Sequence, residues 1–124
     1  MEIYLITNLI NGKQYVGQTI HNKEKRWADH LLDANAKLRR PLAQEILKFG
    51  AQNFRLDTLV RVENPDYLDG LEQHFIRILE TQNPDKGYNQ NAGGFGNRKI
   101  RKKGVRRNSL TLEERLRRLT NRSD

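Results

Sequence analysis

The stretch IYLITNLINGKQYVG, residues 3–17, decides the fold of this chain. Its two ends are rich in β-branched and aromatic residues, which favour strands. Between them stands Asn11-Gly12, a pair favoured in type I′ hairpin turns because both central positions of such a turn need a positive φ. The stretch therefore predicts an antiparallel hairpin with strands over residues 3–7 and 13–17.

Each predicted strand carries one tyrosine, Tyr4 or Tyr15. If Asn11 and Gly12 form a two-residue turn, even positions of the first strand share a face with odd positions of the second. A loop two residues longer keeps this parity and leaves the tyrosines two positions apart, about 7 Å along the strand. In either register both phenols point to the same side of the sheet.

The next segment, residues 22–32, has apolar residues at helical spacing and Asn22 as its N-cap. Arg26 and His30 are four positions apart, so they lie one above the other on the helix surface. We therefore expect a guanidinium and an imidazole to converge with the two phenols of the hairpin.

These motifs resemble the start of the GIY-YIG nuclease domain, especially that of phage homing and freestanding endonucleases. The matching residues are Glu2-Ile3-Tyr4, Tyr15-Val16-Gly17, and Lys25-Arg26-Trp27 with His30; farther on they are Glu72 with Phe75-Ile76, and Gly87-Tyr88-Asn89. The resemblance spans about residues 1–96. Two positions depart from the motif, where Glu2 replaces a glycine and Val16 an isoleucine, and neither supplies chemistry.

The resemblance implies an endonuclease that hydrolyses phosphodiester bonds in double-stranded DNA, with Mg²⁺ as cofactor or Mn²⁺ in its place. It implies Glu72 as the metal ligand and one tyrosine as the group that activates water; the sequence does not decide which tyrosine, and we favour Tyr4. The implied catalytic set is Tyr4, Tyr15, Arg26, His30, Glu72 and Asn89.

The residue types suit this chemistry. Mg²⁺ prefers oxygen ligands and keeps several waters, so a single carboxylate such as Glu72 can hold it. Arg26 can bind a non-bridging phosphate oxygen, and Asn89 can position a phosphate or the water shell of the metal. A phenol has a pKa near 10, so a catalytic tyrosine needs a neighbour such as His30 that stabilises phenolate or accepts its proton.

Taken singly, each of these residues is ordinary: a packed tyrosine, a solvated arginine, a boundary glutamate. Their recurrence in order favours the nuclease. Two alternatives stay open, a non-catalytic nucleic-acid-binding module on the same scaffold and a structure-selective DNA repair nuclease. His21 and His74 have no predicted role.

The rest of the first 96 residues predicts a helix, a strand and a further helix. Pro41 and Gly50 mark the ends of the second helix. A strand over 53–62 has Phe54, Leu56, Val60 and Val62 on one face. After Asn64-Pro65, a third helix carries the stripe Leu68, Leu71, Phe75 and Leu79. The order β-β-α-α-β-α predicts an α+β domain with a three-stranded antiparallel sheet flanked by helices.

The net charge of +8 belongs to the last 28 residues. Residues 1–96 hold twelve basic and twelve acidic residues, whereas residues 97–124 hold eleven and three. We expect this basic tail, with a short helix starting near Thr111, to contact the DNA backbone; the alternatives are a solubilising end or the start of a DNA-reading region. The predicted DNA-contacting residues are Arg39, Arg40, Arg98, Lys99, Arg101, Lys102, Lys103, Arg106 and Arg107.

The composition also excludes several classes. The chain has no cysteine, so it has neither a disulfide framework nor a thiolate metal cluster. It has no apolar run near the roughly 18 residues of a membrane span, and its first residues do not resemble a signal peptide. We expect an intracellular, cytoplasmic protein without membrane contact; the sequence says nothing of its oligomeric state.

Overall fold

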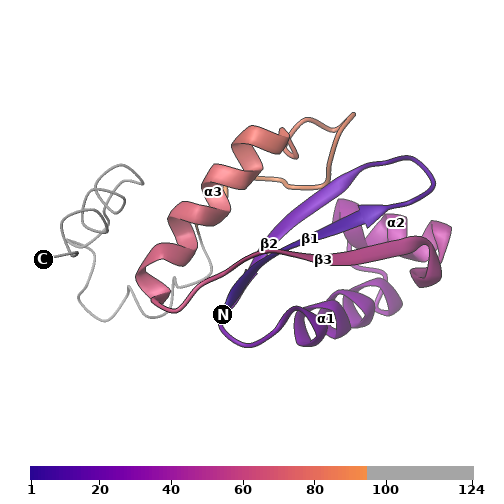
Figure 1. The fold of residues 1–124 in the computed structure, drawn as a ribbon. Helices are drawn as coiled ribbons and strands as arrows, with labels where there is room; N and C mark the ends of the chain where they lie inside the picture. The colour runs from indigo at the N-terminus through magenta and orange to yellow at the C-terminus, as the bar shows by residue number, and fades with distance from the viewer. Residues whose placement is uncertain (95–124) are drawn as a thin grey trace, which may run out of the picture.

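The computed structural model describes residues 1–94 (Figure 1). Its elements are β1 (Glu2–Asn8), β2 (Gln14–Thr19), α1 (Lys23–Asn35), α2 (Pro41–Phe49), β3 (Phe54–Arg61) and α3 (Leu68–Leu79). Single 3₁₀ turns at Ala51–Asn53 and Pro65–Tyr67 precede β3 and α3. The predicted class and element order are confirmed. The basic tail over 97–124, with its seven predicted DNA-contacting residues and short helix, lies outside the described residues.

The three strands form an antiparallel sheet in the order β2-β1-β3. The hairpin takes the longer of the two expected loops, because Asn8 N–H donates to the carbonyl of Lys13 and Thr7 pairs with Gln14. Tyr4 therefore lies opposite Gly17, two positions from Tyr15 along β2. The expected parity is confirmed.

The helices cover the two faces of the sheet differently (Figure 1). α1 and α2 pack on the face that carries Tyr4 and Ile6. α3 packs on the other face, against Ile3 and Leu5. Every residue of β1 is buried, as the central strand between these two layers must be. Within residues 1–94, no helix is long and apolar enough to cross a membrane.

The prediction that one face of β3 carries all four of its apolar residues is wrong. Ile3 pairs with Val60 but Tyr4 pairs with Thr58, so Leu59 is the extra residue of a β-bulge. One inserted residue reverses the alternation of side chains. Leu56 accordingly packs on the α1–α2 side of the sheet, and Val60 on the α3 side.

The capping residues predicted for the first two helices are found at the ends of those helices. The Asn22 side chain accepts a hydrogen bond from the N–H of Lys25 at 2.8 Å, which caps α1. Pro41 begins α2, and Gly50 ends it with a φ of 89°, a conformation that a residue with a Cβ rarely adopts. α1 continues to Asn35, three residues beyond its predicted end.

Glu2, one of the two departures from the motif, connects the first helix to the central strand. Its buried carboxylate accepts hydrogen bonds from the hydroxyl of Thr58 at 2.7 Å and from the N–H of Lys23 at 2.6 Å. Burial alone would raise the pKa of Glu2, but these two hydrogen bonds and the charge of Lys23 hold that pKa below its usual value. Glu2 thus fixes the start of α1, which carries Arg26 and His30, against β1, which carries Tyr4.

Candidate active site

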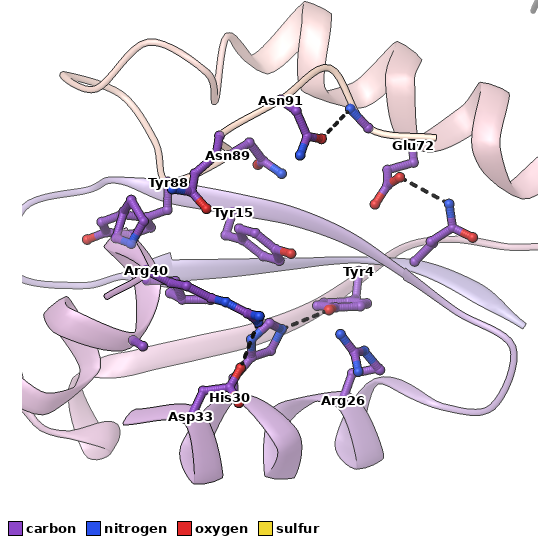
Figure 2. A pocket seen from close by; sticks show the side chains of 16 residues that line it. Tyr4, Tyr15, Arg26, His30, Asp33, Arg40, Glu72, Tyr88, Asn89 and Asn91 are labelled. Atoms are coloured by element: carbon purple, nitrogen blue, oxygen red, sulfur yellow. Dashed lines mark hydrogen bonds and ion pairs between the residues drawn. The ribbon is translucent and has the colours of Figure 1, made fainter. Parts of the chain in front are cut away.

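All six predicted catalytic residues line one cavity of about 410 Å³ (Figure 2). β1 and β2 supply the tyrosines, α1 supplies Arg26 and His30, α3 supplies Glu72, and the segment after α3 supplies Asn89. The full lining is Tyr4, Tyr15, Gln18, Arg26, His30, Asp33, Arg40, Pro41, Leu42, Ala43, Glu72, Tyr88, Asn89, Gln90, Asn91 and Gly93. The cavity therefore gathers residues from Tyr4 to Gly93, which are 89 positions apart along the sequence.

Gly17 allows Tyr4 to reach this cavity. The two residues are opposite one another in the β1–β2 register, and a Cβ built on Gly17 would fall onto the Cζ and Oη atoms of Tyr4. Because Gly17 has no side chain, the phenol ring lies across β2 toward the edge of the sheet. The glycine of Tyr15-Val16-Gly17 thus sets the position of the tyrosine of Glu2-Ile3-Tyr4.

If Tyr4 takes part in the DNA cleavage that the resemblance implies, Gly17→Ala is expected to reduce cleavage by about 100-fold, because a displacement of about 1 Å in a reacting group has an effect of that size. The added methyl group must push the Tyr4 ring aside, at a cost to stability of about 1–3 kcal/mol. Cleavage rates and thermal unfolding of the two proteins measure both effects. Wild-type cleavage by a folded Gly17→Ala protein would contradict this role of the glycine.

His30 lies against both tyrosines. The Oη of Tyr4 and the Nε2 of His30 are 2.9 Å apart and hydrogen bonded. The rings of Tyr15 and His30 meet edge to face, with centroids 5.2 Å apart, and the centroids of the two tyrosines are 6.4 Å apart. The three rings form a compact group in which a proton can pass between a phenol and the imidazole.

The pKa values in this group favour neutral forms. Burial raises the pKa of Tyr4 well above its usual value, and the neighbouring Tyr15 adds to the effect. Burial, with the charge of Glu72, raises the pKa of Tyr15 to about 12. Burial, with the charge of Arg26, lowers the pKa of His30 to about 4. Near pH 7 the imidazole is therefore uncharged and able to accept a proton.

The lowered pKa of His30 predicts a pH-dependent stability. The unfolded chain protonates His30 below a pH of about 6.5, whereas the folded chain does so only near 4. The contribution of His30 is thus complete above about pH 6.5 and is lost as the pH falls toward 4. Between pH 7 and 5 the wild type should lose about 2 kcal/mol more than His30→Gln in urea unfolding. Parallel losses in the two proteins would contradict the shift.

Glu72 comes from the opposite layer. α3 packs on the face away from the tyrosines, yet the carboxylate passes the edge strand β2 and enters the same cavity. Its side chain is buried, and its Oε1 accepts hydrogen bonds from the N–H of Gly94 at 2.7 Å and from the amide of Gln18 at 3.0 Å. Burial raises the pKa of Glu72, and these two hydrogen bonds oppose the rise.

The side chains around Glu72 fit one kind of metal ion. Within residues 1–94 no group of three or more His, Cys, Asp or Glu side chains could hold a metal. A zinc site needs such a group. Mg²⁺ and Mn²⁺ accept one protein carboxylate, with water and a substrate phosphate completing the shell. The donor set therefore fits a hard divalent cation that the substrate helps to bind.

Two arginines line the cavity, each beside an acid of α1. Arg26 pairs with Asp29 at 2.9 Å. Arg40 pairs with Asp33 at 3.3 Å (Figure 2). Both guanidinium groups remain partly exposed. Arg39, which the sequence grouped with Arg40, is exposed and does not line the cavity.

Asn89 fastens the segment after α3 to the edge strand. Its Nδ2 donates to the carbonyl of Val16, and its Oδ1 accepts from the N–H of the same residue, both at 2.9 Å. The side chain thus pairs with β2 as a further strand would. Asn89 holds residues 88–94 beside the cavity, which places the N–H of Gly94 on Glu72.

Sequence reasoning missed Asp33, Gln18 and Gly94. Asp33 could have been predicted, since it follows Arg26 and His30 at helical spacing on α1. Gln18 gave no signal, because strand alternation places it on the face away from the tyrosines. Gly94 acts through its backbone N–H, which no residue pattern reveals.

A family model described as the GIY-YIG catalytic domain matches residues 1–89. Among solved structures, the chain is similar to a mutant of the catalytic domain of intron endonuclease I-TevI, with 29% identity and a TM-score of 0.67 over 77% of this chain and 100% of that one. The catalytic domain of homing endonuclease I-TevI gives 28% identity and a TM-score of 0.61 over 71% and 95%.

Among curated proteins, the chain is similar to uncharacterized protein 019R of Invertebrate iridescent virus 6. The two are 27% identical over 92 residues, which are 73% of this chain and 33% of that protein. The chain thus spans about a third of the length of this relative. Its match to the family model covers most of its own length, and the cavity holds the residues expected from the motifs. The chain therefore belongs to the GIY-YIG family, and its residues 1–89 match the catalytic domain of that family.

Proposed function

We propose that this chain is a divalent-metal-dependent endonuclease of the phage homing type that hydrolyses phosphodiester bonds in double-stranded DNA. One observation carries the proposal: the carboxylate of Glu72 and the Tyr4–His30 pair enter the same cavity from opposite layers of the domain. A scaffold that only binds nucleic acid has no need of a buried acid beside a buried phenol–imidazole pair.

In this proposal Glu72 holds Mg²⁺, or Mn²⁺ in its place. When bound, the ion neutralises charge on the phosphate and stabilises the leaving oxygen. Arg26 leaves Asp29 and binds a non-bridging oxygen of the scissile phosphate. Tyr4 takes a proton from the attacking water while it passes its own proton to Nε2 of His30, which requires the imidazole tautomer with hydrogen on Nδ1. Tyr15 completes the wall of the site beside His30.

The proposal is tested by incubating supercoiled plasmid with the protein and Mg²⁺, Mn²⁺ or EDTA. We expect nicked or linear DNA with either ion and intact plasmid in EDTA. Binding without cleavage in every buffer would favour the non-catalytic module. Cleavage restricted to branched substrates, with plain duplex left intact, would favour a structure-selective repair nuclease.

We also propose that the basic tail, residues 97–124, contacts the DNA backbone, together with Arg40 at the cavity. The charge distribution supports this, because residues 1–96 have no net formal charge whereas residues 97–124 carry the whole excess of +8, which attracts phosphates.

Deletion of residues 97–124 is expected to weaken DNA binding and to flatten its salt dependence. Each neutralised phosphate contributes a slope of about −0.9 in log K against log salt, so losing several contacts lowers the slope by several units. Binding titrations across a salt series measure the slope for the whole chain and for residues 1–96. An unchanged slope would remove the tail from the interface.

A further inference from the structure

Gln18 connects β2 to two acids on α3. Its Nε2 lies 2.8 Å from Oδ1 of Asp69 and 3.0 Å from Oε1 of Glu72. Because both neighbours are carboxylate oxygens, the atom that faces them must be the amide nitrogen. That NH₂ group has two hydrogens and gives one to each carboxylate.

The segment after α3 supplies a second donor to the same oxygen of Glu72. The N–H of Gly94 donates to Oε1 at 2.7 Å. The preceding Gly93 has a φ of 86°, and a Cβ on it would lie 2.8 Å from Cδ1 of Ile76 and 3.0 Å from Oε1 of Glu72. The backbone thus lies directly on the carboxylate, with no room for a side chain between them.

These two donors distinguish the oxygens of Glu72. Both hydrogen bonds found for this carboxylate among residues 1–94 end on Oε1. Figure 2 shows the other oxygen directed into the cavity, toward the tyrosines. A cation that approaches from the cavity therefore meets Oε2, while Oε1 accepts hydrogen bonds from Gln18 and Gly94.

We propose that Gln18 is a positioning residue of the metal site, which holds Oε1 of Glu72 so that Oε2 is the single oxygen offered to the cation. This inference rests on the function proposed above. Gln18 also places an NH₂ group between two buried acids that stand three positions apart on α3, and so separates their like charges. Mutation of a residue that orients a ligating carboxylate typically lowers metal affinity by about 10- to 100-fold.

Gln18→Met tests the inference, because methionine fills similar space but donates no hydrogen bond. Mn²⁺ binding, followed by EPR of the free ion, is expected to weaken by about 10- to 100-fold. The Mg²⁺ concentration for half-maximal cleavage should rise by a similar factor, while the rate at saturating Mg²⁺ stays within a few-fold of wild type. Gln14→Met is the matched control, since Gln14 is on the same strand and donates to Thr7 instead.

Unchanged Mn²⁺ affinity in a folded Gln18→Met protein would overturn the inference. If that variant fails to fold, Gln18→Ala replaces it, since water can then occupy the space of the amide; Mn²⁺ affinity equal to wild type would again overturn the inference. A wild type that neither binds Mn²⁺ nor cuts DNA would defeat the proposed function. A wild type that does both, with Gln18 variants of equal affinity, would defeat only the role of Gln18.

Discussion

Glu72→Ala is expected to abolish DNA cleavage while the protein stays folded and still binds DNA. Glu72 is the acid of α3 that lines the cavity, and its loss removes the ligand proposed above for the cation. Charge stabilisation by such an ion is worth several kcal/mol, so cleavage should fall by about 10³-fold or more. Single-turnover cleavage of duplex DNA at saturating Mg²⁺ measures the loss.

The fold should tolerate this change. Gln18 keeps Asp69 as an acceptor, and water can reach the N–H of Gly94 through the emptied corner of the cavity. Removing a buried carboxyl whose pKa burial raises also relieves a desolvation cost. Glu63→Ala is the control, since Glu63 is exposed. Cleavage at the wild-type rate by the Glu72 variant would defeat the metal assignment.

Tyr4→Phe is expected to lower the cleavage rate by about 10²- to 10⁴-fold, the range for loss of a general acid or base. The substitution removes only the hydroxyl, which is the group that meets Nε2 of His30. Substrate binding should change little, so the effect falls on kcat. Tyr15→Phe should cost less, because in this structure Tyr15 meets His30 through its ring.

Tyr88→Phe provides the matched control for the tyrosines. Tyr88 also lines the cavity, but its hydroxyl bonds to Asn8 and Glu45 on the far side.

Thermal unfolding should show that Tyr4→Phe loses about 1–3 kcal/mol of stability, because His30 loses a buried hydrogen-bond partner. A greater loss of cleavage in Tyr15→Phe than in Tyr4→Phe would transfer the role of base to Tyr15.

The parts of the fold that depend on local chemistry could be predicted from the sequence. Asn22, Pro41 and Gly50 mark helix ends through caps and backbone angles that need only their immediate neighbours. The shared face of Tyr4 and Tyr15 follows in the same way from the alternation of side chains along a hairpin, which holds for either loop length.

The bulge at Leu59 could not be predicted in this way. Alternating apolar residues continue through it, so the pattern of β3 indicates a single apolar face. Only the pairing with β1, in which Ile3 and Tyr4 meet partners two positions apart, reveals the reversal. Such a shift depends on how two strands far apart in the sequence are matched, and residue types along one strand do not encode that match.

The sequence motifs name six residues that line one cavity, but they do not reveal how the fold brings these residues together. The motifs name Glu72, yet they give no reason why an acid on the far layer should reach the phenols. The reach depends on β2 being an edge strand and on Gly17 letting the Tyr4 ring cross it. Gln18 could not be predicted either, because its position along the strand assigns its side chain to the face of the sheet away from the phenols.

The side chain of Asn89 has a consequence for contacts between molecules. A bare edge strand presents unpaired N–H and C=O groups that can recruit a strand from another copy of the protein. On β2 the peptide groups of Val16 and Gln14 are already taken, by Asn89 and by the backbone of Lys86 and Tyr88. These peptide groups, at the border of the sheet nearest the cavity, are therefore not available to pair with a strand from another copy.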